Sequence, residues 1–133
     1  YALGKSGERF AVRNSGALAV TEGTGDHCCE YMTGGKVVIL GSTGRNIGAG
    51  MTGGVAFILD EKNQLSSKVN HEIISIYKIQ NQKQEEILLE IISDYYKNTS
   101  SIKASRILEE WGKFKLKFKM IVPPSERDML GID

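Results

Sequence analysis

Residues 32–40 read Met-Thr-Gly-Gly-Lys-Val-Val-Ile-Leu, and residues 51–59 read Met-Thr-Gly-Gly-Val-Ala-Phe-Ile-Leu. Six of the nine positions are identical, and the two copies start 19 residues apart. The same register places glycines in two columns, one with Gly16, Gly35 and Gly54 and the other with Gly25 and Gly44, which Asn63 continues. Three turns of one repeat are therefore visible in the sequence.

A short repeat that alternates apolar strands with glycine corners is typical of a solenoid in which each turn pairs with its neighbours. We therefore expect a right-handed, single-stranded parallel β-helix with a 19-residue repeat and about three rungs, followed by a helical hairpin tail. Glycine suits the corners because a side chain there would clash with the next rung or forbid a positive φ. The predicted structural corner glycines are Gly16, Gly25, Gly35, Gly44 and Gly54.

Alternation along the strands predicts which side chains point into the coil. The 19-residue register gives two inward columns, namely Leu18, Val37 and Ala56, and then Val20, Ile39 and Ile58. Lys36 should point outward. Its apolar companions Val38, Leu40, Phe57 and Leu59 predict that another part of the chain covers the outer face.

Composition separates a glycine-rich first part from a charged second part. Thirteen of the fifteen glycines lie in residues 1–60 of the 133-residue chain, and the net charge is +1. We expect repeats over 1–64, a strand and helical extension over 65–122, and a tail or linker over 123–133. The balanced charge gives no reason to expect nucleic acid, and no apolar run reaches the roughly 20 residues of a membrane span. Because the chain begins at Tyr1 inside repeat material, we expect a fragment of a larger chain.

The second part predicts two helices. Apolar residues recur at three-and-four spacing from Gln82 to about Lys97, with Gln84, Glu85, Glu86 and Glu90 on the other side. Residues 98–101 supply a break and a cap, after which Ala104 to Trp111 predict a shorter helix that ends at Gly112. The two helices should form a hairpin that either caps the end of the β-helix or covers its outer apolar column. Residues 69–79 fit either a last strand or the start of a helix.

Residues 113–120 alternate between lysine and apolar side chains. This pattern predicts an edge strand or extended arm with one wet face, since lysine on an exposed edge protects against aggregation. An alternative is that the four lysines dock an acidic partner, such as a small acidic electron carrier. Pro123 and Pro124 then end regular structure.

No motif in the chain predicts catalysis. Residues 48–53 read Gly-Ala-Gly-Met-Thr-Gly, a literal G-x-G-x-x-G, but a predicted strand follows instead of the helix that a dinucleotide site needs. The adjacent Cys28 and Cys29 favour a reduced, intracellular protein, because a disulfide between neighbours is strained. Adding His27 does not make a metal site, since consecutive residues in a strand point to alternate faces. We expect no catalytic, cofactor-binding or metal-binding residue here.

Several ordered motifs carry a family resemblance. They are residues 8–17 (Glu-Arg-Phe-Ala-Val-Arg-Asn-Ser-Gly-Ala), Gly25-Asp26-His27, residues 29–35 (Cys-Glu-Tyr-Met-Thr-Gly-Gly), Gly44-Arg45-Asn46, Ala49-Gly50-Met51 and Gly53-Gly54. They closely resemble the C-terminal GXGXG domain of the glutamate synthase large chain, nearly without gaps over residues 7–60. The resemblance extends through Lys68-Val69-Asn70, the helical pair and Trp111 to Pro123. One departure is Cys28, where we expect glycine in many relatives.

The resemblance implies a parent oxidoreductase of nitrogen metabolism that forms L-glutamate from L-glutamine and 2-oxoglutarate. In that family FMN and an iron–sulfur cluster sit in other domains, so this region implies no cofactor and is not an enzyme in isolation. Its implied role is a rigid spacer that packs against the upstream amidotransferase and FMN-binding synthase domains, in the cytoplasm or a plastid. Residues 122–126 are more similar to the ferredoxin-dependent branch, although an NAD(P)H-dependent parent stays open.

Two further expectations concern the chain outside that parent. A free-standing β-helix module that binds a ligand or partner is the alternative function, similar in its solenoid to the C subunit of formylmethanofuran dehydrogenase. The loops around Gly48 to Gly54 would then be its site. An excised domain would also expose the open end of its stack, which predicts self-association.

Overall fold

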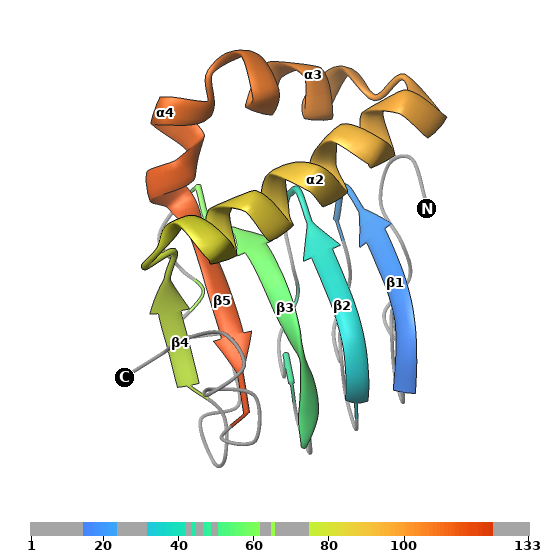
Figure 1. The fold of residues 1–133 in the computed structure, drawn as a ribbon, viewed down its shortest axis with the longest axis vertical. Helices are drawn as coiled ribbons and strands as arrows, with labels where there is room; N and C mark the ends of the chain where they lie inside the picture. The colour runs from blue at the N-terminus through green and yellow to red at the C-terminus, as the bar shows by residue number, and fades with distance from the viewer. Residues whose placement is uncertain are drawn as a thin grey trace.

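The computed structural model describes residues 15–23, 32–41, 44, 47–48, 51–61, 65 and 75–123. Its elements in chain order are β1 (Ser15–Thr21), β2 (Thr33–Ile39), β3 (Gly53–Leu59), β4 (Ser75–Lys78), α2 (Gln82–Thr99), α3 (Ile102–Glu109), α4 (Trp111–Phe114), the 3₁₀ turn η1 (Lys115–Lys117) and β5 (Phe118–Val122). The strands form one five-stranded mixed sheet in the order β1-β2-β3-β5-β4 (Figure 1). The described chain is therefore mainly β with α.

The three repeats predicted from the sequence each form a strand, and successive strands are parallel neighbours. Between β2 and β3 the pairs include Val37 with Ala56 and Ile39 with Ile58, which keeps the predicted spacing of 19 residues. A register shift lies between Thr33 and Lys36 of β2, so that two residues of β2 face one residue of β3.

The register between β1 and β2 differs from the prediction by one residue. Ser15 pairs with Gly34, but a second irregularity follows, and Leu18 then pairs with Lys36 and Val20 with Val38. Because side chains alternate along a strand, a shift of one residue exchanges the two faces. The assignment of Leu18 and Val20 to the inward columns is therefore wrong. Leu18 is 42% exposed, and Val20 packs with the residues under the helices.

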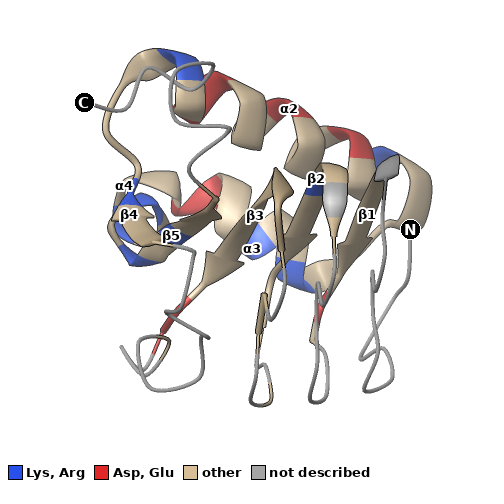
Figure 2. Ribbon diagram, turned by 90° about the horizontal axis from the view of Figure 1, so that it is seen from below, with Lys and Arg blue, Asp and Glu red and all other residues tan. Residues whose placement is uncertain are grey.

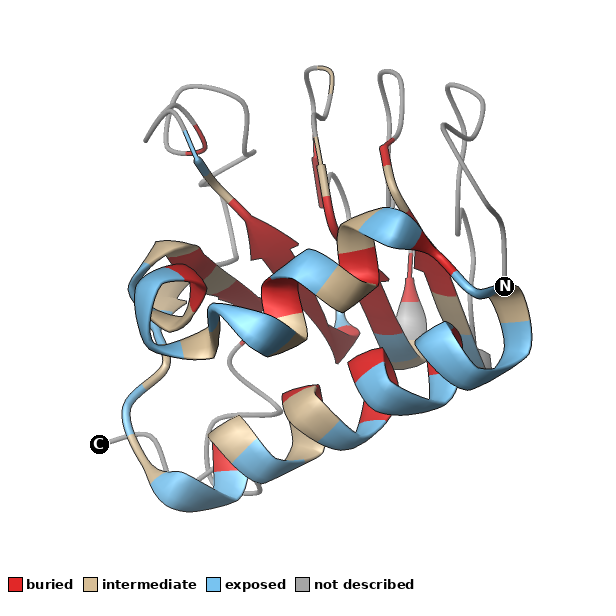
Figure 3. Cartoon of the chain, turned by 90° about the horizontal axis from the view of Figure 1, so that it is seen from above, coloured by how far each residue is buried: buried red, intermediate tan, exposed pale blue. Residues whose placement is uncertain are grey.

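The helices cover one face of the sheet, which confirms that the outer apolar column is covered (Figure 3). Sheet residues of this helix-side core are Val20, Val38, Leu40, Val55, Phe57, Leu59, Phe118, Met120 and Val122. The helices contribute Leu88, Ile91, Ile92, Tyr95, Ala104, Ile107 and Phe114. Lys36 is exposed, as predicted.

The opposite face of the sheet is buried as well. Its core contains Met32, Val37, Ile39, Ile47, Met51, Ala56, Ile58, Leu65 and Ile121. Val37, Ile39, Ala56 and Ile58 are the predicted inward residues of β2 and β3. The positions of Leu18 and Val20 in those columns are taken by Ala19 and Thr21, which pair with Val37 and Ile39. A sheet buried on both faces reads as a nearly continuous apolar run, as residues 55–59 do.

The helical prediction is confirmed in outline. α2 begins at Gln82 as expected, ends with Ser100 in the left-handed region at φ 54°, and packs against α3. The Ser101 side chain accepts a hydrogen bond from the amide of Ala104 and caps α3. The second helix does not run to Gly112, because α3 ends at Glu109 and Gly112 lies in the separate turn α4. Of residues 69–79, Ser75–Lys78 form the strand β4.

The segment of alternating lysines is not an edge strand. Residues 113–117 lie in α4 and η1, and β5 pairs with β3 on one side and β4 on the other. The prediction was wrong because alternating lysine and apolar residues show only that neighbouring side chains have different environments. They do not show which backbone structure produces the difference. In β5, Phe118 and Met120 face the helices, while Ile121 faces the opposite core.

Gly54 shows why the repeat needs glycine. Its φ is 81°, and a Cβ atom built on it would lie 2.8 Å from the carbonyl oxygen of Gly34 and 2.6 Å from Cε of Met32. A side chain would therefore need both a strained backbone and a wider spacing between β2 and β3.

We expect Gly54→Ala to lower the free energy of unfolding by roughly 2 kcal/mol or more, because φ strain and the clash with Gly34 add. Gly112→Ala is the matched control, since nothing lies within 4 Å of the added Cβ there. In a helical turn that change should be neutral or stabilising by at most about 1 kcal/mol. Urea unfolding of both variants measures the difference, and equal stabilities would contradict the close packing at Gly54.

Candidate functional site

The predicted corner glycines occupy different places in the described chain. Gly35 and Gly54, which are 19 residues apart, lie inside β2 and β3, with φ values of 83° and 81°. Gly16 lies in β1, and Gly44 lies between elements and is half-buried. Gly25 lies outside the described residues.

The G-x-G-x-x-G stretch leads into a strand. Gly48 has a φ of 76°, its carbonyl oxygen accepts a hydrogen bond from the amide of Met51 at 3.0 Å, and β3 begins at Gly53. The amides of Thr52 and Gly53 donate to the carbonyl oxygen of Met32, at 2.9 and 3.3 Å. A dinucleotide site would need a helix and free amides here. In this chain the amides instead join two copies of the repeat.

The cysteines and histidines lie outside the described residues, so the structure does not test the predictions for Cys28, Cys29, His27 and His71. Within the described ranges, no group of three or more His, Cys, Asp or Glu side chains is placed to hold a metal ion. In the same part of the chain, no helix is long and apolar enough to cross a membrane.

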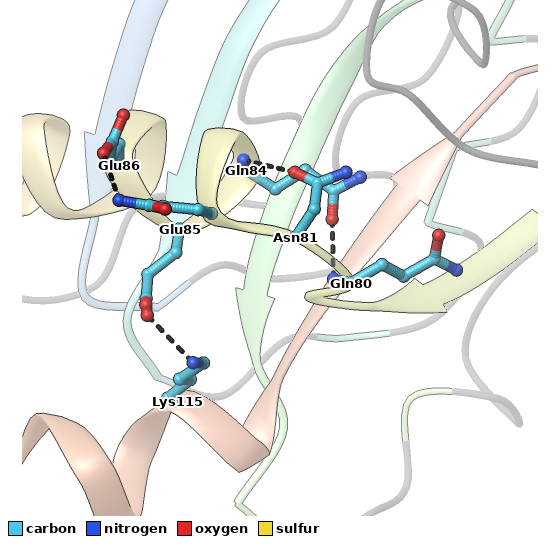
Figure 4. A network of polar contacts seen from close by, with 7 residues as sticks. Gln80, Asn81, Gln84, Glu85, Glu86 and Lys115 are labelled. Atoms are coloured by element: carbon cyan, nitrogen blue, oxygen red, sulfur yellow. Dashed lines mark hydrogen bonds and ion pairs between the residues drawn. The ribbon is translucent and has the colours of Figure 1, made fainter.

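The start of α2 is held by a polar network that sequence analysis missed (Figure 4). The Asn81 side chain accepts from the amide of Gln84 at 2.9 Å, while Oε1 of Gln84 accepts from the amide of Gln80 at 2.7 Å. This reciprocal arrangement is a variant of the capping box, and the spacing of Asn81 and Gln84 was the signal for it. Gln84 is fully buried, so its side chain belongs to the folded core.

The same helix start is joined to the turn η1. Glu85 forms an ion pair with Lys115 at 2.9 Å, with side chains 20% and 41% exposed (Figure 4). The negative charge of Glu85 also lies in the first turn of α2, where the helix dipole favours it.

A nearly buried ion pair joins the end of β3 to β5. Nζ of Lys119 lies 2.8 Å from Oδ2 of Asp60, and the two side chains are 13% and 8% exposed. Both carboxylate oxygens of Asp60 also accept from the amide of Leu65 at 3.2 Å. The amide of Asp60 donates to the carbonyl oxygen of Lys117 at 2.9 Å. Asp60 therefore connects three separate parts of the chain.

The neighbouring residue makes a more exposed pair. Oε1 of Glu61 lies 2.6 Å from Nζ of Lys103 in α3, with side chains 40% and 29% exposed. The hydrogen bond from Lys103 and the positive charges of Lys103, Lys117 and Arg106 hold the pKa of Glu61 below its ordinary value, against the opposing effect of burial.

Tyr95 joins α2 to the segment after β1. Its side chain is fully buried, and its hydroxyl donates to Oε2 of Glu22 at 3.1 Å. Burial, together with the charge and hydrogen bond of Glu22, raises the pKa of Tyr95 from 10.0 to about 12. An ionised phenol would be both desolvated and repelled by the carboxylate, so the neutral hydroxyl is favoured.

These polar contacts hold parts of the fold together. Asp60 and Tyr95 connect segments that are far apart in the chain, and Gln84 fixes the start of α2 by bonding to Gln80. The Nε1 atom of Trp111 is the buried side-chain polar atom that has no partner among the described residues. The described contacts therefore join strands of the sheet to one another and join the sheet to α2.

We expect Lys119→Met to lower the free energy of unfolding by about 3 kcal/mol, because it leaves the Asp60 carboxylate buried without its counter-ion. Lys103→Met removes the partner of the adjacent Glu61 and should cost about 0.5 kcal/mol, since that pair is more exposed. Urea unfolding at neutral pH compares the two. Equal losses of unfolding free energy would show that burial does not make the Lys119–Asp60 pair more important than the Lys103–Glu61 pair.

The raised pKa of Tyr95 predicts a loss of stability in alkaline solution. The unfolded chain releases this proton near pH 10.0, whereas the folded chain retains it up to about 12. The contribution is therefore fully present below pH 10 and is lost as the pH rises through about 12. Tyr95→Phe should reduce the fall in stability between these values. Tyr96→Phe, at a phenol that is 41% exposed, is the control, and identical slopes in the two variants would contradict the assignment.

Comparison with known proteins places these features in a family. The family model described as the GXGXG motif matches residues 1–124. Similar relatives include the protein named ferredoxin-dependent glutamate synthase 2, chloroplastic, from Arabidopsis thaliana, with 56% identity over 96% of this chain and 8% of the relative.

Two further relatives extend the comparison. The ferredoxin-dependent glutamate synthase 2 of Synechocystis is 55% identical over 96% of this chain and 8% of its own length. The glutamate synthase [NADH] of Schizosaccharomyces pombe is 46% identical over 98% of this chain and 6% of its own length. The chain thus spans less than a tenth of these relatives, yet they match it almost from end to end. With its family model covering residues 1–124, the chain belongs to the GXGXG family.

Proposed function

We propose that this chain is the C-terminal GXGXG region of a glutamate synthase large chain. The parent enzyme then forms L-glutamate from L-glutamine and 2-oxoglutarate in nitrogen assimilation. The observation that carries the proposal is the 56% identity over 96% of the chain with a relative named as a glutamate synthase. The coverage of 8% of that relative supports a region within a larger protein.

The role proposed for the region is that of a rigid spacer between the amidotransferase and FMN-binding synthase domains. Burial supports this role, because both faces of the sheet carry packed cores. The pair of Asp60 with Lys119 joins two strands of the sheet over 59 residues of sequence, and the hydrogen bond of Tyr95 to Glu22 ties α2 to the sheet over 73 residues. A region stabilised in this way resists bending, which a spacer requires.

The β-helix is part of the same proposal. Three parallel strands one repeat apart, with positive φ at Gly35 and Gly54, are what one wall of a solenoid contains. In the proposed architecture β1, β2 and β3 form that wall, and β5 and β4 extend the sheet at one side.

The remaining properties of the parent follow from the assignment. FMN and an iron–sulfur cluster belong to its other domains, and the chain described here holds no cofactor and performs no turnover by itself. The proposed location is the cytoplasm or a plastid, and the name of the Arabidopsis relative supports the plastid as one site. We further propose ferredoxin as electron donor, because the two ferredoxin-dependent relatives named above are 56% and 55% identical to this chain, against 46% for the NADH-named relative above.

A binding experiment tests the spacer role. Calorimetric titration of the 133-residue chain with FMN, NADPH and 2-oxoglutarate should show no binding to any of them. The full-length protein should form glutamate from glutamine and 2-oxoglutarate when supplied with reduced ferredoxin. Micromolar binding of any of the three compounds to the isolated chain would contradict a purely structural role. Absence of glutamate formation by the full-length protein would contradict the assignment of the parent.

A further inference from the structure

The strand β5 lies inside the sheet, although it follows all the other described elements in the chain. It stands between β3 and β4 and is antiparallel to both (Figure 1). β3 and β4 are therefore not neighbours, and each turns toward β5 a backbone edge that β5 completes with hydrogen bonds. We call these two facing edges the β3–β4 slot. Without β5 the described sheet would be divided in two.

The side chains of β5 fit the cores on both sides of the slot. Met120 pairs with Phe57 of β3, and its side chain is fully buried in the helix-side core. Ile121 pairs with Ala56, and its side chain is fully buried in the opposite core. A strand with apolar side chains on both faces needs a place where both faces are covered. The slot provides that place.

A charged contact marks the end of the slot. Lys119 of β5 forms the nearly buried ion pair with Asp60, in the acidic segment directly after β3 (Figure 2). The amide of Asp60 donates to the carbonyl oxygen of Lys117, which continues the pairing by one residue beyond β5. A shift of β5 by one residue would turn the Lys119 side chain into the helix-side core. These contacts therefore disfavour that shift.

The helical layer is attached to the sheet at both of its ends through β5. α2 follows β4 after a short connection, and in the described chain β5 is the strand with which β4 pairs. At the other end, α4 and η1 lead directly into β5 itself. The segment from β4 to β5 therefore forms one unit, and β5 is the strand of this unit that pairs with β3.

We propose that the β3–β4 slot is a binding site for a peptide strand, which β5 fills as the closing strand of the fold and which also accepts this segment as a separate peptide. The ligand that the slot takes is an extended segment with apolar side chains on both faces and a lysine near its start. Main-chain hydrogen bonds to two strands supply affinity, and the side chains supply specificity. The helical layer attaches firmly to the repeats only when residues 118–122 are in place.

Burial and tethering favour β5 over a second copy of the chain as the occupant. An empty slot would expose the backbone edges of β3 and β4 together with apolar side chains of both cores. The connection through η1 holds β5 close to the slot, and a short tether of this kind gives a millimolar effective concentration. A separate peptide must therefore be supplied at a similar concentration.

Two truncations of the full-length protein test the closing role. A chain that ends at Lys117 lacks β5, whereas a chain that ends at Pro124 keeps it and is the matched control. A glutamate-specific protease under native conditions should cut at Glu90 in α2 and Glu109 in α3 about tenfold faster in the shorter chain, because these helices have lost an attachment. The chain that ends at Pro124 should be cut at the rate of the unaltered protein. Equal rates in the two truncated chains would overturn the proposal.

Addition of the missing strand tests the binding site. A peptide of residues 118–124 (Phe-Lys-Met-Ile-Val-Pro-Pro), which this protease does not cut, should at about 1 mM return the cleavage rate of the shorter chain toward that of the unaltered protein. The same peptide with Met120→Ser and Ile121→Ser keeps the length and the lysine, and it should have no effect because it lacks an apolar contact to each core. If neither peptide slows cleavage, or if both slow it equally, the slot does not recognise β5 and the proposal is overturned.

Hydrogen exchange in the intact full-length protein gives a second measurement that needs no truncation. Met120→Ala weakens the closing strand and should speed the exchange of the amides of β4 and α2 by about tenfold. Val38→Ala is the matched control, because it removes apolar atoms from the same helix-side core on β2 and should leave the amides of β4 unchanged. Unchanged exchange in Met120→Ala, or equal acceleration of β4 by both substitutions, would overturn the proposal however the shorter chain folds.

Discussion

The close approach of successive repeats is the constraint on which this structure depends. A Cβ atom at Gly54 would lie 2.8 Å from the carbonyl oxygen of Gly34, and the amides of Thr52 and Gly53 donate to Met32 in the preceding repeat. These backbone contacts set β2 and β3 side by side and leave no room for a side chain at Gly54. The last glycine of the stretch that resembles a nucleotide-binding loop, Gly53, therefore serves the pairing of one repeat with the preceding one.

Stacking alone would leave two apolar faces in water, and the remainder of the chain buries both of them in the region described. The helices cover the face with Val38 and Phe57, while Met51 and Leu65 belong to the core on the other side. Polar contacts then fasten the layers. Asp60 ties β3 to β5 and to Leu65, and Tyr95 ties α2 to Glu22. These contacts lie at the ends of strands, so they do not interrupt the apolar surface, and the Tyr95 contact also holds α2 against the sheet.

Each prediction from the sequence that is wrong has a physical cause in the tertiary structure. The 19-residue register predicts the wrong face for Leu18 and Val20, because an irregularity between Ser15 and Leu18 moves the pairing by one residue. The amino-acid sequence of that segment does not indicate the irregularity. The alternation of lysine and apolar residues over 113–120 predicts an edge strand or an extended arm. In the structure one turn of that pattern is helical, and Lys119 of β5 is paired with Asp60 in a nearly buried position. The spacing of Asn81 and Gln84 is typical of a helix cap, and it is the sequence signal for these contacts.

The sequence by itself determined the repeat, its three strands, the need for a covered outer face and the two helices. These features depend on local periodicity and on the conformational freedom of glycine, which act over a few residues. Only the tertiary structure decided that β5 inserts between β3 and β4, that Val20 faces the helices, and which carboxylate meets Lys119. Those outcomes depend on contacts between residues far apart in the chain. Several strand pairings are locally equivalent, and the pairing that buries the most apolar surface in total is favoured.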